Sequence, residues 1–299
     1  MKQQTKGCLT LLLTAMIWGA AFVAQSEGMQ YVGPFTMQAT RFFLAGLVLL
    51  PVIFFCDRRG ITQNRPVTAA QQKRHLLCGI LCGLFLFGGS SLQQLGILYT
   101  TVGKSGFITA LYIILVPIIG LFLKKRVGLN VWCGVVLSLV GLYFLCMRGA
   151  TGLNPGDLLT FGCAIFFSFH ITYIDSVCGS LDGIRLSCIQ FFTCSAISAV
   201  CMFAFETPSW QSIFSCWLPI VYAGVLSGGA GYTLQIIGQK NTPPVLASII
   251  MSLESVFAAI FGWLLIQQAL SGWELLGCAL MFAATILAQL PERQEKHVK

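Results

Sequence analysis

Apolar runs of membrane-crossing length constrain this 299-residue chain more than any other feature of its sequence. A helix needs about 20 mostly apolar residues to cross a bilayer, and only helices and closed barrels satisfy their backbone hydrogen bonds inside lipid. Ten such runs follow one another, at residues 7–25, 35–55, 76–99, 106–123, 129–147, 157–174, 184–205, 217–238, 245–266 and 273–290. The sequence therefore predicts an all-α polytopic membrane protein with ten transmembrane helices.

Composition excludes several other classes of protein. With 56% hydrophobic and 9% charged residues, the chain is too apolar for a soluble domain. Its net charge of +8 does not indicate nucleic-acid binding, because the basic residues lie between apolar runs and form no basic face with interleaved aromatics. Most of the 13 cysteines lie inside apolar runs without ligand spacing, which is typical of small hydrophobic residues. We predict no cofactor.

The second half of the chain repeats the first. Residues 89–134 are written again, in altered form, at 231–277, and the matching pairs are Gly89/Gly231, Leu92/Leu234, Gln93/Gln235, Gly96/Gly238, Ser105/Ser248, Leu123/Ile266 and Gly134/Gly277. A period of half the chain is a duplication and not a solenoid repeat. We predict a first five-helix repeat at residues 1–150, a second at 151–290 and a charged cytoplasmic tail at 291–299.

Charge predicts that the two repeats have opposite orientations. The basic run 124–126 becomes the uncharged 267–269 in the second copy, and positive residues gather on the cytoplasmic side of membrane proteins. With both termini cytoplasmic, only Lys104 and Arg148 of the 18 basic residues lie in outside segments, and Arg41 lies within the second run. We predict a multi-pass protein of the cell membrane, plasma or inner, with cytoplasmic N- and C-termini. The first run is expected to be a membrane helix and not a cleaved signal peptide, because its counterpart in the second half is internal.

Small residues recur at matching places in the two halves. Gly79 and Gly83 in the third run, and Gly224 and Gly228 in the eighth, are small-xxx-small pairs that let neighbouring helices approach closely. One hypothesis is that the third and eighth runs pack against each other through these glycines. Pro117 is expected to kink the fourth run.

The ninth run carries Ser248, Ser252 and Ser255 at helical spacing. Such a stripe forms either a close-packing seam between helices or the wall of a cavity.

Three short stretches, Ala-Met-Ile-Trp-Gly at 15–19, Arg-Phe-Phe-Leu-Ala-Gly at 41–46 and Ser-Leu-Glu-Ser-Val-Phe-Ala-Ala at 252–259, carry a resemblance that spans essentially the whole chain. The sequence resembles the drug/metabolite transporter superfamily, specifically its EamA family of ten-span carriers. The resemblance implies transport of small metabolites, often amino acids or related compounds, and frequently export. The family commonly has proline after the glutamate of the ninth span; here the residue is Ser255, which puts the helix break expected there in doubt.

Two charged residues lie inside the apolar runs. An ionised group at the bilayer centre costs at least ~2.5–3.5 kcal/mol on insertion scales, so a charged residue there is expected to have a functional or structural role. Glu254, deep in the ninth run, can act as a reversible proton carrier or, alternatively, tie helices together. Arg41 can face the substrate, snorkel to the interface or form a structural ion pair.

Several neutral polar and aromatic residues join Glu254 in the predicted substrate pathway. His170 can titrate near neutral pH or serve as a hydrogen-bonded packing residue, and the amides can bind a polar solute or bond across helices. The candidate pathway residues are Trp18, Gln93, Gln94, His170, Tyr232, Gln235 and Glu254.

These features predict a secondary transporter rather than an enzyme. The sequence has no HExxH, no GxSxG and no phosphate-binding loop, although a membrane enzyme acting on a lipid or lipid-linked substrate stays the alternative. Inverted-repeat carriers bind substrate near mid-membrane between their halves. We expect alternating access for a small organic metabolite, with proton coupling as an option. The predicted partners are this solute and the lipid bilayer, with no nucleic acid, and both a monomer and a homodimer stay open.

Overall fold

The computed structural model describes residues 2–99, 102–125, 127–147, 154–266 and 271–290. Every regular element in these ranges is a helix, which confirms the all-α prediction. Nine helical runs among the described residues are long and apolar enough to cross a membrane, and the shorter apolar helix Leu129–Leu145 corresponds to the fifth predicted span. Arg126, the run 267–269 and the tail 291–299 lie outside the described residues, so the charge swap and the tail are not seen.

The first half contains α1 (Lys2–Gly28), α2 (Pro34–Arg58), α3 (Ala69–Ile97), α4 (Val102–Thr109), α5 (Tyr112–Phe122), α6 (Leu129–Leu142) and the π-helical η1 (Tyr143–Met147). The second half contains α7 (Pro155–Val177), α8 (Gly183–Phe205), the short α9 (Trp210–Ser215), α10 (Trp217–Val221), the π-helical η2 (Tyr222–Tyr232), α11 (Thr233–Gln239), α12 (Pro244–Met251), α13 (Glu254–Ile266) and α14 (Gly272–Gln289).

Capping residues set where several spans begin. Thr68, Asn154 and Ser271 each accept a hydrogen bond from the backbone of the third helical residue, whose side chain bonds back to the cap. This capping box satisfies donors that have no partner at a helix N-terminus.

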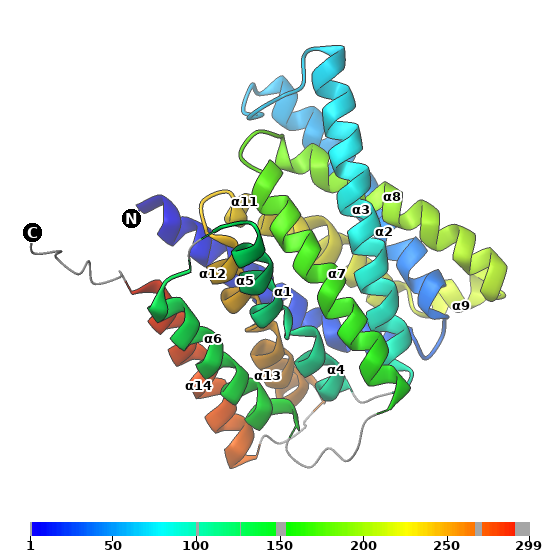
Figure 1. The fold of residues 1–299 in the computed structure, drawn as a ribbon. Helices are drawn as coiled ribbons and strands as arrows, with labels where there is room; N and C mark the ends of the chain where they lie inside the picture. Colours follow the sequence, from blue (N-terminus) through cyan, green and yellow to red (C-terminus); the bar gives the residue numbers. More distant parts are fainter. Residues whose placement is uncertain (1, 100–101, 126, 148–153, 267–270, 291–299) are drawn as a thin grey trace, which may run out of the picture.

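Helices of one half pack mainly against helices of the other half. In the first half α3 contacts α7 and α8 of the second, while η2 contacts α1 and α2. The second helices of the two repeats, α2 and α8, pack on each other, as do the last helices, α6 and α14. Figure 1 shows α3 beside α7 and α6 beside α14. The contacts that helices of the first half make with the second half therefore match those that the second half makes with the first. Because each half has five spans, an odd number, the second repeat has the opposite orientation in the membrane.

The paired glycines lie at close contacts, but the third and eighth spans do not pack on each other through them. A Cβ on Gly83 would lie 2.6 Å from the Cβ of Thr193 in α8. A Cβ on Gly228 would lie 2.8 Å from the Cβ of Ala45 in α2. The hypothesis of a direct contact is therefore wrong: each glycine pair receives the second helix of the other repeat.

The fourth span is interrupted at residues 110–111, between α4 and α5. Pro117 does not mark this break: it lies within α5, and its ring disturbs the helix only as far back as residue 113. The kink expected at Pro117 stays a prediction.

The ninth span is also interrupted, at residues 252–253 between α12 and α13, although its only proline, Pro244, lies at the start of α12 and not near the break. Ser248 and Ser252 donate to the carbonyl oxygens of Val245 and Ile249, at 2.7 Å each. Such back-bonding competes with the helix ladder and bends helices, so the serine stripe offers a cause for the break.

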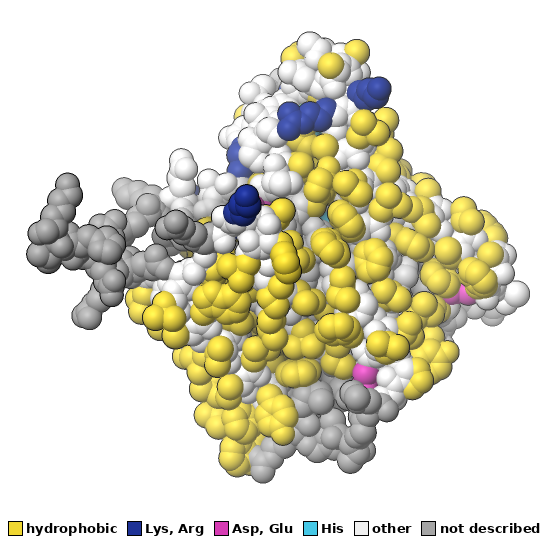
Figure 2. All heavy atoms as spheres, in the orientation of Figure 1, with side chains coloured by type: hydrophobic (Ala, Val, Ile, Leu, Met, Phe, Trp, Pro, Cys, Tyr) yellow, Lys and Arg dark blue, Asp and Glu magenta, His cyan; other side chains and the backbone are white. Residues whose placement is uncertain are grey.

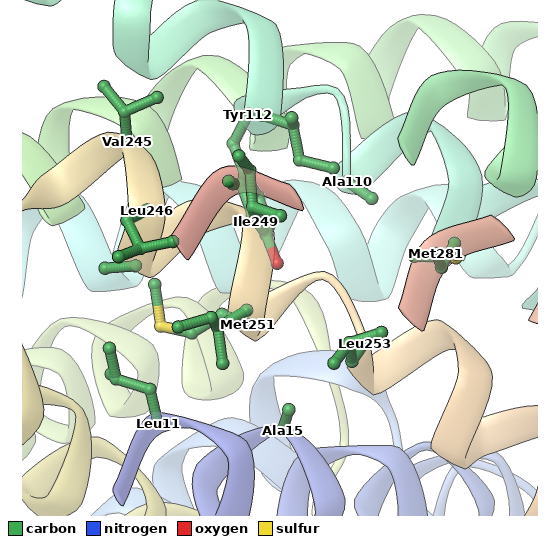
Figure 3. Packing of buried hydrophobic residues seen from close by; sticks show 14 of the residues in the cluster. Leu11, Ala15, Ala110, Tyr112, Val245, Leu246, Ile249, Met251, Leu253 and Met281 are labelled. Atoms are coloured by element: carbon green, nitrogen blue, oxygen red, sulfur yellow. The ribbon is translucent and has the colours of Figure 1, made fainter. Parts of the chain in front are cut away.

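The main hydrophobic core surrounds the two breaks. Figure 3 shows Ala110 and Tyr112 of the fourth span near Ile249 and Leu253 of the ninth, with Leu11 of α1 in the same cluster. The outer surface is largely apolar: Figure 2 shows Lys and Arg side chains only over the upper part of the visible face, above a broad hydrophobic band. This distribution suits a protein embedded in lipid.

Candidate functional site

A cavity lies at the centre of the bundle, between the two halves. Its lining residues are Trp18, Ala21, Phe22, Gln25, Arg41, Gln93, Tyr112, Phe167, His170, Ile171, Ser227, Tyr232, Gln235, Met251 and Glu254. The space open to the centres of water molecules is ≈ 50 Å³, enough for a few waters. The structure therefore shows a compact form of the cavity.

The structure brings together six of the seven predicted pathway residues. Trp18, Gln93, His170, Tyr232, Gln235 and Glu254 all line the cavity, and so does Arg41. Gln94 does not line it, although it is fully buried on α3. None of the three serines of the ninth span lines the cavity either, and all three are buried, which favours the packing-seam interpretation.

Glu254 is the first residue of α13, directly after the break in the ninth span. Its side chain is buried and accepts a hydrogen bond from the hydroxyl of Tyr112, at 3.2 Å. Tyr112 is itself the first residue of α5, directly after the break in the fourth span. The two breaks therefore place a carboxylate and a phenol from opposite halves together, and the positive end of the α13 dipole favours a negative charge there.

Arg41 is 4% exposed and lies on α2. Its guanidinium donates to the amide oxygen of Gln25 and lies 4.6 Å from the centre of the Phe42 ring. Among the described residues, no carboxylate lies within salt-bridge distance of it. The structure thus shows neither the snorkelling nor the ion pair that the sequence allowed.

Aromatic rings form one wall of the cavity. The rings of Trp18 and Tyr232 are 4.7 Å apart, and those of His170 and Tyr232 are 6.1 Å apart. Trp18 also donates from Nε1 to the carbonyl of Ser227, at 3.2 Å. His170 Nε2 lies 3.0 Å from Oε1 of Gln190 in α8, so this histidine is hydrogen-bonded and also faces the cavity.

The two glutamines matched by the repeat both reach the cavity. Gln93 donates to the Thr109 hydroxyl at 3.2 Å, and Gln235 donates to Oε1 of Gln239 at 3.0 Å. The Oε1 atom of Gln235 is buried and has no partner, so it can accept a hydrogen bond from a solute.

Some lining residues were not predicted as site residues from the sequence. Gln25 and Tyr112 are the most notable, because each holds one of the two cavity charges. Helical spacing could have identified Gln25, because it lies two turns after Trp18 on the same face of the first helix. Among the described residues, no cluster of three or more His, Cys, Asp or Glu side chains could hold a metal ion.

The chain matches the model of the EamA-like transporter family twice, over residues 5–147 and 154–290. A protein of Archaeoglobus fulgidus described as an uncharacterized transporter is 30% identical over 283 residues, covering 94% of this chain and 85% of the relative. The uncharacterized inner membrane transporter YedA of Escherichia coli is 23% identical over 281 residues, covering 92% and 88%.

Another relative, which matches a shorter part of the chain, has a named substrate. The threonine/homoserine exporter RhtA of Salmonella typhimurium is 26% identical over 187 residues, covering 60% of this chain and 61% of the relative. A crystal structure of a protein that is 21% identical superposes with a TM-score of 0.78, over 95% of this chain and 96% of that one. It supports the fold alone. The double match of the family model covers nearly the whole sequence, and the chain therefore belongs to the EamA-like transporter family.

Proposed function

We propose that this protein exports a small zwitterionic metabolite, an amino acid or a close relative, across the cell membrane by alternating access. The single observation that carries the proposal is the pair of cavity charges. Arg41 comes from the first half and Glu254 from the second, both line the cavity, and each has a neutral hydrogen-bond partner in place of the other.

The chemistry of a zwitterion fits this pair. A guanidinium binds a carboxylate through charge-assisted hydrogen bonds, and a carboxylate accepts hydrogen bonds from an ammonium group. A solute that carries both groups would neutralise both cavity charges at once and connect the two halves. A solute with only a positive charge would leave Arg41 buried without a carboxylate, which is costly. A solute with only a negative charge would pair with Arg41 but gain nothing from Glu254.

The size of the cavity supports alternating access. The ≈ 50 Å³ open to water centres holds a few waters, so the halves must separate before an amino acid can enter. The interrupted fourth and ninth spans provide shorter helical segments at the cavity, as broken helices do in many secondary transporters.

Glu254 also supports an exchange of solute for protons. A carboxylate in a low-dielectric cavity can hold a proton while the site is empty and release it when the ammonium group of a solute arrives. The proton and the solute amine would then compete for one site, which couples their movements in opposite directions.

Direction and orientation are part of the proposal. Export is supported by the name of the threonine/homoserine exporter, to which this chain is similar over part of its length. Cytoplasmic termini are supported by the bias of basic residues along the sequence. Cysteines placed at Lys125 and Gln268 test the orientation: an impermeant thiol reagent should label the second in intact cells and the first only after permeabilisation.

A proteoliposome screen tests the function. Purified protein is reconstituted, and counterflow of radiolabelled amino acids, including threonine and homoserine, is measured beside organic cations and organic anions. We expect saturable flux of at least one amino acid without chemical change. Flux of singly charged solutes alone would contradict the zwitterion proposal, and conversion of the solute would favour an enzyme.

A further inference from the structure

A second polar cluster lies next to the cavity, between α2, α3 and α8. We call it the α2–α3–α8 cluster; its members are Gln38, Ser90, Ser91, Gln94, Cys194, Ser195 and Ser198, all buried. These three helices contact one another, and none of the seven residues lines the cavity. The amide and hydroxyl groups of this cluster therefore need partners within the protein.

Hydrogen bonds and side-chain contacts connect the three helices through this cluster. Gln38 accepts a hydrogen bond from Ser90 at 2.5 Å and donates to Ser91 at 3.1 Å. The thiol of Cys194 lies beside the hydroxyls of Ser90 and Ser198. Gln38 precedes Arg41 by three residues on α2, and the Cys194 thiol is close enough to the Arg41 guanidinium to interact with it electrostatically. The cluster thus adjoins one of the two cavity charges.

Several buried polar atoms at this place have no partner. Neither amide atom of Gln94 has one, nor does the Nε atom of Arg41. The hydroxyl of Ser198 has only the weakly bonding thiol of Cys194 beside it. Gln94 and Ser198 are both 0% exposed. Gln94 lies three and four residues after Ser91 and Ser90, so it shares their face of α3. Ser198 likewise lies one turn after Cys194 on α8.

Leaving such groups unpaired is costly. A buried donor or acceptor without a partner costs ~1–3 kcal/mol, and unpaired groups at this depth cannot reach solvent in a bilayer. Buried polar groups that lack protein partners commonly bind ordered water, which makes about three hydrogen bonds to them. Uncharged amides and hydroxyls offer both donors and acceptors, as water requires, and do not favour an ion of either sign.

We propose that the α2–α3–α8 cluster binds ordered water molecules that contact Gln94 and Ser198 and hydrate the Arg41 guanidinium away from Gln25. Charged residues within membranes usually face the bundle interior or a water-filled space. This water would keep Arg41 charged while the cavity is compact. The inference does not depend on the identity of the transported solute.

Native cysteines permit a direct test in the unmodified protein. Cys194 and Cys82 are both 0% exposed, but Cys82 lies in an apolar cluster with Ile174 and Leu186. Hydroxyl radicals generated from bound water by X-rays oxidise the thiols beside it, and mass spectrometry measures the rate at each cysteine. We expect Cys194 to be oxidised several-fold faster than Cys82. Equal protection of the two thiols would overturn the proposal.

Two substitutions, with a matched control, test which atoms hold the water. Gln94→Met keeps the length of the side chain and removes its amide, and Ser198→Ala removes the hydroxyl. We expect both variants to slow Cys194 oxidation several-fold. Ser138 on α6 is also buried without a partner, so Ser138→Ala should leave the Cys194 rate unchanged. Thermal stability gives a second readout: water loss should lower the melting temperature of Gln94→Met, whereas a higher melting temperature would show a dry site.

Discussion

The two halves of the molecule share a scaffold and differ in their chemistry. Arg41 and Gln190 are each the eighth residue of their helix, α2 from Pro34 and α8 from Gly183. Each bonds to the preceding helix of its own half, Arg41 to Gln25 and Gln190 to His170. Only Arg41 lines the cavity; Gln190 reaches it through His170. The two halves therefore keep the helix-to-helix contact and differ in which side chain faces the cavity.

The broken spans show the same difference. The break at 110–111 and the break at 252–253 lie in corresponding spans of the two repeats, but the first residue after the second break is Glu254, whereas the first residue after the first break is Tyr112. One half thus supplies the cation and the other the anion. A duplicated fold becomes able to recognise a polar, asymmetric solute when its two copies diverge at a few cavity positions.

Replacing Arg41 by glutamine, the residue at the matching position of α8, should have the largest effect on solute binding. Arg41→Gln copies the residue of α8 into α2, and we expect about 10- to 100-fold weaker solute binding, because a hydrogen bond to a charged group contributes ~1.5–3 kcal/mol. Counterflow in proteoliposomes measures the loss. Gln190→Met is the matched control, and it should affect binding less. Equal losses in the two variants would show that Arg41 has no special role.

Removing the charge of the second half should separate binding from coupling. Glu254→Gln keeps the shape and the contact with Tyr112, so we expect the variant to insert normally and to lose transport driven by a pH gradient. Glu274→Gln, at the exposed N-terminus of α14, is the control. If Glu254→Gln responds to the gradient as the parent does, the carboxylate has a structural role.

Filling the matched glycines should damage both halves to a similar extent. Gly83→Leu and Gly228→Leu would press α8 and α2 away from their partners, and overpacking typically costs ~1–3 kcal/mol. Gly106→Leu is the control, because a Cβ there would meet only the Ser255 hydroxyl, at 3.9 Å. Thermal unfolding in detergent measures the change, and unchanged stability of both test variants would show that these contacts tolerate expansion.

The smallest effect is expected from a proline at the existing break. Ser255→Pro removes one backbone hydrogen bond, from Ser255 N to Ser252 O at 3.1 Å, worth ~0.5–1.5 kcal/mol, and stiffening the unfolded chain offsets ~0.4–1 kcal/mol. Ala259→Pro, inside α13, should cost ~3 kcal/mol or more. Equal losses of melting temperature would show that the ninth span behaves as a continuous helix at Ser255.

Much of this architecture could be predicted from the sequence, because lipid allows few solutions. Apolar runs of membrane-crossing length predict the helices. A charge buried in a membrane is costly, which singles out Arg41 and Glu254 as candidate site residues. Helix partners could not be predicted in the same way. A small-xxx-small pair shows that a contact is close but not which helix makes it. The sequence therefore did not show that Gly83 packs on α8 and Gly228 on α2.

Side-chain contacts between distant segments were also out of reach. Tyr112 meets Glu254 across 142 positions of sequence, and only the joint position of two helix breaks brings them together. The sequence alone does not predict the break in the ninth span, because Ser255 stands where the family commonly has proline. The structure shows a break supported by serine hydroxyls bonded to the backbone, a weaker signal that one sequence does not reveal.

Binding measured as a double-mutant cycle tests the central claim most directly. The amino acid with the greatest flux in the screen is compared with its carboxamide, which lacks the negative charge, in the parent protein and in Arg41→Gln. If Arg41 binds the solute carboxylate, the carboxamide should bind far more weakly than the amino acid to the parent, and the two should bind almost equally to Arg41→Gln. An equal ratio of affinities in both proteins would contradict the account.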